Sequence, residues 1–145
     1  NRGISGDVIN GVIDRLEEVV SAQPKKIFLM IGTNDLGRKR SIEQILADYD
    51  KLVSLIIQKT PETQLYLQSV LPTKNQTNRN NHDIIEINKG IVALAQKYSL
   101  TYINLFDLFK TSENELNMEY SFDGLHLNGQ GYVLWKEAVI KYVEK

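Results

Sequence analysis

The fold class is decided by one stretch, Lys26-Ile27-Phe28-Leu29-Met30-Ile31-Gly32-Thr33-Asn34-Asp35. Residues 26–31 form a short apolar run that ends at a glycine, which is typical of a strand buried within a parallel sheet. Polar residues follow at once. In open α/β sheets, ligands bind beyond the carboxyl ends of the strands, so the stretch predicts both a buried strand and a functional site at its end.

Helical and strand patterns alternate along the rest of the chain. Apolar residues recur at helical spacing in the predicted helices, and short apolar runs bounded by turn residues mark the predicted strands. Such alternation is typical of parallel strands joined by right-handed crossovers, so we expect an α/β fold, a three-layer α/β/α sandwich around a parallel sheet. The predicted elements are helix 7–21, strand 26–31, helix 42–58, strand 64–70, loop 73–81, helix 83–98, strand 101–105 and helix 129–143.

The composition excludes several classes of protein. A chain of 145 residues with 42% hydrophobic residues can bury one core, and we expect a single domain over residues 1–145. The net charge of -1, with no basic run, gives no surface for nucleic acid or anionic lipid. The chain has no cysteine, which excludes disulfides, thiolate zinc sites and a cysteine nucleophile.

The sequence shows neither a membrane-spanning segment nor a signal peptide. The longest apolar run, residues 27–31, is far too short to span a bilayer, so we expect no integral membrane segment. No signal peptide is visible. Because the chain begins at Asn1 and not at a methionine, the compartment stays open.

Three polar clusters from distant parts of the chain are expected at the same rim of the sheet. Residues 1–7 precede the first helix, with Ser5 and Asp7 placed where an N-cap oxygen is expected. Residues 32–35 follow the first strand, and residues 123–126 lie some way after the third. Convergence of polar segments at one sheet edge is the geometry of a binding or catalytic site.

The residue types in these clusters suit acyl transfer. A catalytic histidine needs a carboxylate on one ring nitrogen, and Asp123 lies three residues before His126. The side-chain amide of Asn34 can donate to a developing oxyanion, and Gly3 lets its backbone N–H approach a tetrahedral intermediate closely. A base, its orienting carboxylate and two oxyanion donors are thus present, and only the nucleophile lacks a candidate.

These clusters resemble the blocks of the SGNH (GDSL) hydrolase family, which is named for its Ser, Gly, Asn and His blocks. Asn-Arg-Gly-Ile-Ser-Gly at residues 1–6 resembles the glycine block, Gly-Thr-Asn-Asp at 32–35 matches GxND, and Asp-Gly-Leu-His at 123–126 matches DxxH. Residues 127–132 continue the last block as family members do. Each motif alone is weakly specific, but three of them in the family's order, across the whole chain, are strongly specific.

The resemblance implies a flavodoxin-like serine esterase that forms an acyl-enzyme and needs no metal or cofactor. It implies His126 as the base, Asp123 as its orienter, and Gly3 and Asn34 as oxyanion donors. Family members of this size act on short acyl esters, acetylated sugars, lysophospholipids or thioesters. The short loops here favour a small-molecule ester with a short acyl group, acetyl especially, on a carbohydrate or lipid-derived alcohol.

The family's serine block is the departure from the pattern. It lies upstream of the glycine block, and nothing precedes Asn1 here. Ser5 stands beside a glycine and an aspartate in reversed order, so we do not take it as the nucleophile. We expect the serine and two strands of a five-stranded sheet upstream of Asn1. A missing N-terminal segment or another subunit is expected to cover the exposed sheet edge, and the chain alone is expected to be inactive.

Other readings stay open at this stage. A non-catalytic α/β module that binds a ligand at the strand ends fits a chain without a nucleophile. A flavodoxin-like phosphate or flavin binder would need a longer and less acidic phosphate loop than residues 32–35. The structural roles to be tested are a turn or cap for Asn34, a brace for Asp35, a turn with Gly124 for Asp123, a surface loop for His126 and a positive φ for Gly3.

Overall fold

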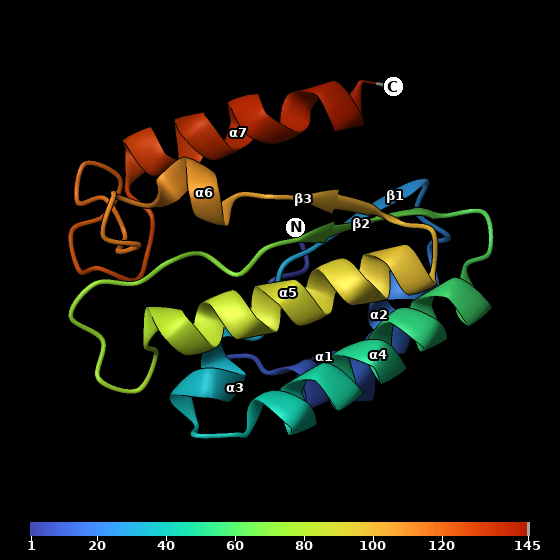
Figure 1. Cartoon of the computed structure of the whole chain (residues 1–145). Coiled ribbons are helices and arrows are strands. Elements are labelled where there is room, and N and C mark those ends of the chain that lie inside the picture. The colour runs from blue at the N-terminus through green and yellow to red at the C-terminus, as the bar shows by residue number, and fades with distance from the viewer. Residues whose placement is uncertain (145) are drawn as a thin grey trace.

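The computed structural model describes residues 1–144 and has three layers (Figure 1). The middle layer is a parallel sheet in the order β1-β2-β3. Helices α1, α2, α4 and α5 lie against one face, and α7, with α6 beside it, lies over the other (Figure 1). The strands are β1 (Lys26–Leu29), β2 (Gln64–Gln68) and β3 (Thr101–Ile103).

The predicted α/β architecture is confirmed, with four long helical regions where the sequence places them. The helices are α1 (Ile9–Asp14), α2 (Leu16–Val20), α3 (Thr33–Gly37), α4 (Ile42–Lys59), α5 (Asn81–Lys97), α6 (Phe106–Phe109) and α7 (Gly129–Val143).

Two features of the helices were not predicted. The predicted helix 7–21 is broken at Arg15, whose backbone lies at φ -107° and ψ 18°. The guanidinium of Arg15 reaches back to the carboxylate of Asp7 at 2.7 and 3.0 Å. The short helices α3 and α6 are each about one turn, which is too short to show a periodic pattern.

Each strand ends two residues earlier than predicted, and after β2 and β3 side chains bond to the backbone in place of a neighbouring strand. Asn88 on α5 accepts from the N–H of Val70 at 2.8 Å and donates to its carbonyl at 3.0 Å. The hydroxyl of Ser69 accepts from the N–H groups of Leu105 and Phe106 at 2.9 and 2.7 Å. The apolar runs therefore continue past the ladder without forming strand.

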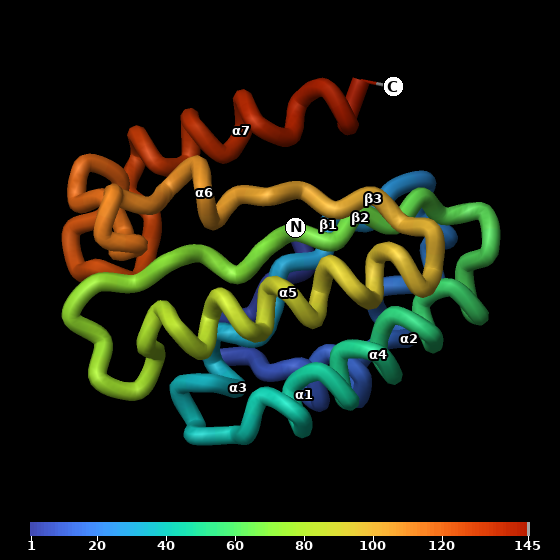
Figure 2. Tube along the Cα trace, in the orientation of Figure 1, coloured from blue at the N-terminus to red at the C-terminus, as the bar shows by residue number. Residues whose placement is uncertain are grey.

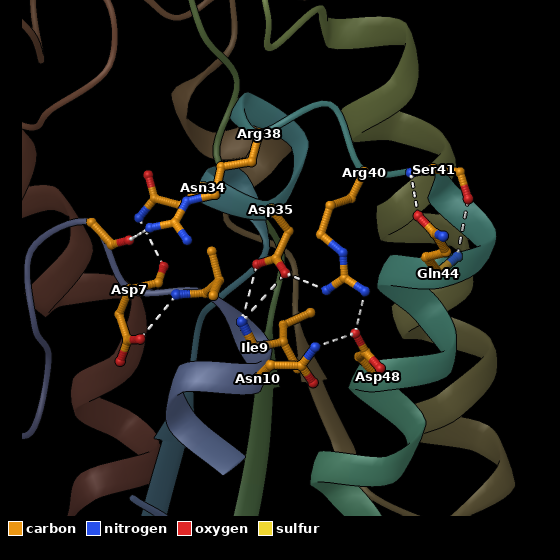
Figure 3. Close-up of polar contacts among 12 residues, drawn as sticks. Asp7, Ile9, Asn10, Asn34, Asp35, Arg38, Arg40, Ser41, Gln44 and Asp48 are labelled. Carbon is orange, nitrogen blue, oxygen red and sulfur yellow. Dashed lines mark hydrogen bonds and ion pairs between the residues drawn. The ribbon is translucent and has the colours of Figure 1, made fainter. Parts of the chain in front are cut away.

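Helices α4, α5 and α7 begin at side-chain caps, which satisfy backbone N–H groups of the first helical turn. Ser41 and Gln44 form a capping box at the start of α4 (Figure 3). Asn80 accepts from the N–H of Asp83 at the start of α5, and Asn128 accepts from that of Gly131 at the start of α7. His82 is exposed beside the α5 cap, as a solvated neighbour of the cap should be.

The two faces of the sheet carry separate apolar clusters. Ile45, Leu52, Ile84, Ile87 and Ile91 pack between the sheet and α4 and α5, where all five are fully buried. The opposite cluster includes Tyr66, Ile103, Leu105, Phe109 and Leu116, with one side of α7 packed against it. The two clusters together hold the strands rigidly, which fixes the position of the segments that follow their carboxyl ends.

Both edges of the sheet are open. Within residues 1–144, β1 and β3 each pair with β2 alone, so the outer sides of both strands carry unpaired backbone groups. An unpaired edge of this kind is a template for a further strand.

None of the helices in residues 1–144 has the length and apolar character needed to cross a bilayer.

Candidate active site

The segments that follow the three strands meet at one end of the sheet, as Figure 2 shows. The loop after β2 and the segment before α7 lie side by side there, because the N–H of Lys74 donates to the carbonyl of Gly124 at 2.8 Å. The end of β1 leads into α3, which carries Asn34 and Asp35. The predicted convergence of the GxND and DxxH blocks at this end of the sheet agrees with this arrangement.

Asp123 and His126 form the pair that the sequence predicts. Nδ1 of His126 lies 2.6 Å from Oδ2 of Asp123. The other oxygen of this carboxylate accepts from the backbone N–H groups of Leu125 and His126 at 2.9 and 2.8 Å. Asp123 therefore forms the turn with Gly124 and at the same time contacts the imidazole of His126.

This contact keeps Asp123 ionised. The hydrogen bond from the His126 side chain holds the pKa of the Asp123 carboxyl well below its usual range, and the backbone N–H groups of His126 and Leu125 act in the same direction. An ionised carboxylate at Nδ1 leaves Nε2 as the nitrogen that can accept a proton. The His126 side chain is 77% exposed, so Nε2 is open to a nucleophile and a substrate.

The turn that carries Asp123 is docked on the loop after β2. Gly124 has φ +75°, and a Cβ there would lie 2.2 Å from the carbonyl oxygen of Lys74. Gln76, from the same loop, donates to the carbonyl of Asp123 at 3.0 Å. The close approach requires glycine at position 124, and it fixes the position of the DxxH block against the loop after β2.

Asn34 lies in the first turn of α3, with its amide nitrogen turned toward the N-terminal segment (Figure 3). Nδ2 donates to the carbonyl of Asp7 at 2.9 Å, and Oδ1 accepts from Nη2 of Arg79 at 3.2 Å. A primary amide has two N–H bonds, and a single bond from Nδ2 leaves one of them for a ligand. Asn34 can therefore act as an oxyanion donor without losing its structural contacts.

Asp35 has a structural role, and a longer-range one than the predicted brace (Figure 3). Its carboxylate is fully buried and accepts from the N–H of Ile9, the first residue of α1, at 3.1 Å. It also lies 3.1 Å from Arg40, which pairs with Asp48 at 2.6 Å. Burial raises the pKa of Asp35, against the opposing effect of its hydrogen bonds with Ile9 and Arg40.

The predicted caps of the first helix, Ser5 and Asp7, are wrong, because Asp35 takes the place of an N-cap side chain. Val8 is the N-cap residue of α1, and it makes no side-chain cap bond. Ser5 is exposed and Asp7 bonds to Arg15 and to the N–H of Val8. The donor at the start of α1 is satisfied by Asp35, which is 26 residues away in sequence.

Gly3 is not brought into contact with the other site residues. Its N–H donates to Oδ1 of Asn1 at 2.8 Å, and residues 1–6 are exposed. The positive-φ reading of Gly3 is wrong, because the glycine with positive φ in this segment is Gly6. The role of Gly3 as an oxyanion donor stays a prediction.

The sequence of residues 1–134 matches the family described as GDSL-like Lipase/Acylhydrolase. The chain belongs to this family. The predicted family and fold class are therefore confirmed, and membership supports a general esterase function in the class of carboxylic ester hydrolases.

Solved structures of this GDSL-like family share the fold. A Streptococcus pneumonia protein provisionally described as a platelet activating factor is 29% identical, with a TM-score of 0.91 over 98% of this chain and 71% of that one. A GDSL-like lipase from Bacteroides thetaiotaomicron VPI-5482 is 24% identical, with a TM-score of 0.88 over 99% and 74% of the two chains.

Curated relatives are much longer proteins. The N-acylneuraminate cytidylyltransferase of Escherichia coli O18:K1:H7 is 30% identical over 122 residues, which are 81% of this chain and 28% of that protein. The Streptococcus agalactiae serotype V enzyme of the same name is 23% identical over the whole chain. The chain spans about a third or less of the length of these relatives.

A small cavity lies between the Asn34 and His126 blocks of this GDSL-like domain. Its volume is about 120 Å³. Buried at its edge, the hydroxyl of Thr33 has no hydrogen-bond partner within residues 1–144. No cluster of potential metal ligands occurs in the part of the chain that the structure describes. The cavity is lined by Met30, Ile31, Thr33, Val70, Leu71, Pro72, Thr73 and Leu125.

Two site residues were not predicted, Gln76 and Arg79 in the loop after β2. Arg79 donates from Nε to the carbonyl of Thr33 at 3.0 Å and from Nη2 to Asn34, while Gln76 reaches Asp123. The only signal in the sequence is a lone arginine in a loop rich in Asn and Thr, which does not reveal what the arginine contacts.

We expect Asp35→Ala to lower the free energy of unfolding by about 2–4 kcal/mol, because it leaves the Ile9 N–H and Arg40 without their buried partner. The matched control is Asp14→Ala, at an exposed position on α1, with a change within about 0.5 kcal/mol. Urea denaturation of the full-length gene product measures both. Equal effects of the two substitutions would contradict the capping role of Asp35.

Proposed function

We propose that this chain carries the base, the orienting carboxylate and the oxyanion donors of a serine ester hydrolase. The observation that carries the proposal is the 2.6 Å contact between Nδ1 of His126 and the Asp123 carboxylate, with Nε2 left open. A histidine held in this way by an ionised carboxylate is the base of serine hydrolases on several unrelated folds.

The reaction has two acyl-transfer steps. A serine oxygen attacks the ester carbonyl carbon while its proton passes to Nε2 of His126. The Asn34 amide, the Gly3 N–H and the N–H of the nucleophile stabilise the oxyanion. The C–O bond to the alcohol then breaks, and the alcohol leaves with the proton from His126. Water, deprotonated by His126, then attacks the acyl carbonyl carbon. The bond from this carbon to the serine oxygen breaks, the acid is released, and the proton on His126 returns to the serine.

The nucleophile is proposed to come from a segment upstream of Asn1. Two features support this: β1 has an unpaired outer edge, and no serine hydroxyl bonds to His126 within residues 1–144. A strand added at that edge would end at the same rim as Asn34, because parallel strands share their direction. An N-terminal segment, or a second subunit, is the proposed cover for the edge.

The substrate is proposed to be an ester of a short acyl group, acetyl especially, with a small carbohydrate or lipid-derived alcohol. The cavity beside Thr33 has a volume of about 120 Å³, whereas pockets for drug-sized ligands typically hold about 300–1,000 Å³. Its lining is mostly apolar, which suits the hydrocarbon part of an acyl group. The polar alcohol would then face the solvent beside His126.

The alternative function is a ligand-binding module without catalysis. The observation that favours it is the same missing contact between His126 and a serine hydroxyl within the described residues. The two functions differ in the sequence upstream of Asn1. A Gly-Asp-Ser after an apolar strand is expected for the esterase, and the module lacks it.

The first test compares the full-length gene product with residues 1–145 alone. We expect the full-length product to hydrolyse p-nitrophenyl acetate, and the 145-residue chain to be inactive and not to melt as a cooperative monomer, since it lacks the nucleophile and exposes a sheet edge. Activity and thermal unfolding are measured on both. Turnover by the short chain would refute the upstream nucleophile.

The second test is Asn34→Ala in the full-length product. Loss of one oxyanion donor typically costs about 10²–10³ in rate, so kcat should fall by that factor while the protein stays folded. The matched control is Asn78→Ala, at an exposed position in the loop after β2, with kcat unchanged. Wild-type turnover by Asn34→Ala would show that the oxyanion assignment is wrong.

The third test is a series of p-nitrophenyl esters with acyl chains from acetyl to dodecanoyl. We expect kcat/KM to be highest for acetyl or another short chain, because the cavity beside Thr33 is small. An optimum at eight carbons or more would exclude the proposed acyl specificity and leave the esterase mechanism intact.

A further inference from the structure

We infer that Arg79 is a positioning residue that fixes the orientation of the Asn34 carboxamide, so that its nitrogen end faces the reacting carbonyl. The inference rests on the esterase function proposed above. It assigns a role to the loop after β2, which belongs to none of the blocks that identify the family.

The orientation matters because a carboxamide has two ends of nearly the same shape and opposite hydrogen-bonding character. The nitrogen end donates to an oxyanion and stabilises it, whereas the oxygen end would repel it. Rotation of the Asn34 amide by 180° about its terminal C–C bond would therefore replace a hydrogen-bond donor by an oxygen that repels the oxyanion. The surroundings of the amide must decide between the two orientations.

Two hydrogen-bond partners of the amide favour the same orientation. Arginine has donors and no acceptor, so Nη2 of Arg79, at 3.2 Å, can face only the oxygen of the Asn34 amide. The carbonyl of Asp7, at 2.9 Å from Nδ2, can face only the nitrogen. The rotated amide would set two donors against each other at one end and two acceptors at the other. The arginine and the carbonyl thus favour one orientation.

The guanidinium itself is well placed for this task. Nε of Arg79 donates to the carbonyl of Thr33 at 3.0 Å, so two of its nitrogens contact neighbouring residues of one segment. Gly37 makes room for it, because a Cβ at that position would lie 2.4 Å from Nη2. The loop is anchored in turn by the hydroxyl of Thr73, which donates to the carbonyl of Arg79 at 2.5 Å.

Arg79 also acts on the charge of the site. No carboxylate pairs with its guanidinium within the described part of the chain, residues 1–144. A hydrogen bond from a cation to an amide oxygen draws electron density away from the nitrogen, which makes its N–H a stronger donor. The Arg79 guanidinium therefore stabilises the oxyanion indirectly, by polarising the Asn34 amide, and does not contact the substrate.

The expected effect follows from this indirect action. Loss of Arg79 leaves the amide in place but lets it sample both orientations, so the cost should stay below that of removing Asn34. We expect Arg79→Met to lower kcat about 10- to 100-fold and to change KM less than about twofold, because the interaction is made with the oxyanion of the transition state.

The test is a double-mutant cycle in the full-length gene product, with p-nitrophenyl acetate as substrate. Arg79→Met is compared in the wild type and in Asn34→Ala, with exposed Lys39→Met as the matched control. If Arg79 acts through Asn34, its loss changes kcat less than about twofold in the Asn34→Ala background. The same fold-loss in both backgrounds, or no loss in the wild type, overturns the inference.

A second variant guards against misfolding. Arg79→Lys keeps the positive charge and a donor but cannot span Thr33 and Asn34 together. It is expected to recover part of the loss in kcat. Should Arg79→Met fail to melt cooperatively, Arg79→Lys enters the same cycle with the same criterion, and equal losses in the two Asn34 backgrounds again overturn the inference.

A readout that needs no activity separates this inference from the proposed function. The side-chain amide signals of Asn34 in a ¹⁵N NMR spectrum are assigned by their loss in Asn34→Ala. Arg79→Met should shift them and speed their exchange with water, and Lys39→Met should not. If these changes occur in a protein without esterase activity, the proposed function fails, while the orientation of the Asn34 amide by Arg79 stands. If activity is present and the signals do not change, the positioning role fails.

Discussion

The buried carboxylate of Asp35 is the interaction on which the site depends. A fully buried charge is tolerated only when it is paired and hydrogen-bonded, and Asp35 meets this condition with Arg40 and the N–H of Ile9. The pairing ties the start of α1 to the end of β1. The carbonyl of Asp7, just before α1, is thereby brought to the Asn34 amide, so a structural carboxylate indirectly positions the proposed oxyanion donor.

The second constraint is the loop after β2, which contacts both halves of the site. Gln76 holds the backbone of Asp123, and Arg79 holds Asn34. The proposed base, His126, and the proposed oxyanion donor, Asn34, are more than 80 residues apart in sequence, and neither of their blocks bonds directly to the other among the contacts described above. The loop after β2 therefore fixes their relative position, although its sequence predicts only a polar loop. Functional residues are often positioned by loops on a rigid scaffold.

Much of the fold was predictable, since long amphipathic helices and apolar runs report burial directly. The contact within the DxxH block was predictable because Asp123 and His126 are close in sequence, and the GxND block was predictable because it directly follows an apolar strand. Contacts between distant segments were not predictable. The cap that Asp35 provides for α1, the strand ends taken over by Asn88 and Ser69, and the two loop side chains all depend on tertiary geometry. The break at Arg15 and the one-turn helices α3 and α6 fall below the length at which periodicity is informative.

Gly124 gives this arrangement a consequence for sequence variation. Its backbone lies so close to Lys74 that even one methyl group at Cβ would overlap a carbonyl oxygen, and that oxygen belongs to the loop that also carries Gln76 and Arg79. Any side chain at position 124 must push this loop away from the DxxH turn. The displacement would reach Asp123 and Asn34 together, so the hydrogen atom that glycine carries in place of a methyl group preserves the relative position of the proposed base and the proposed oxyanion donor.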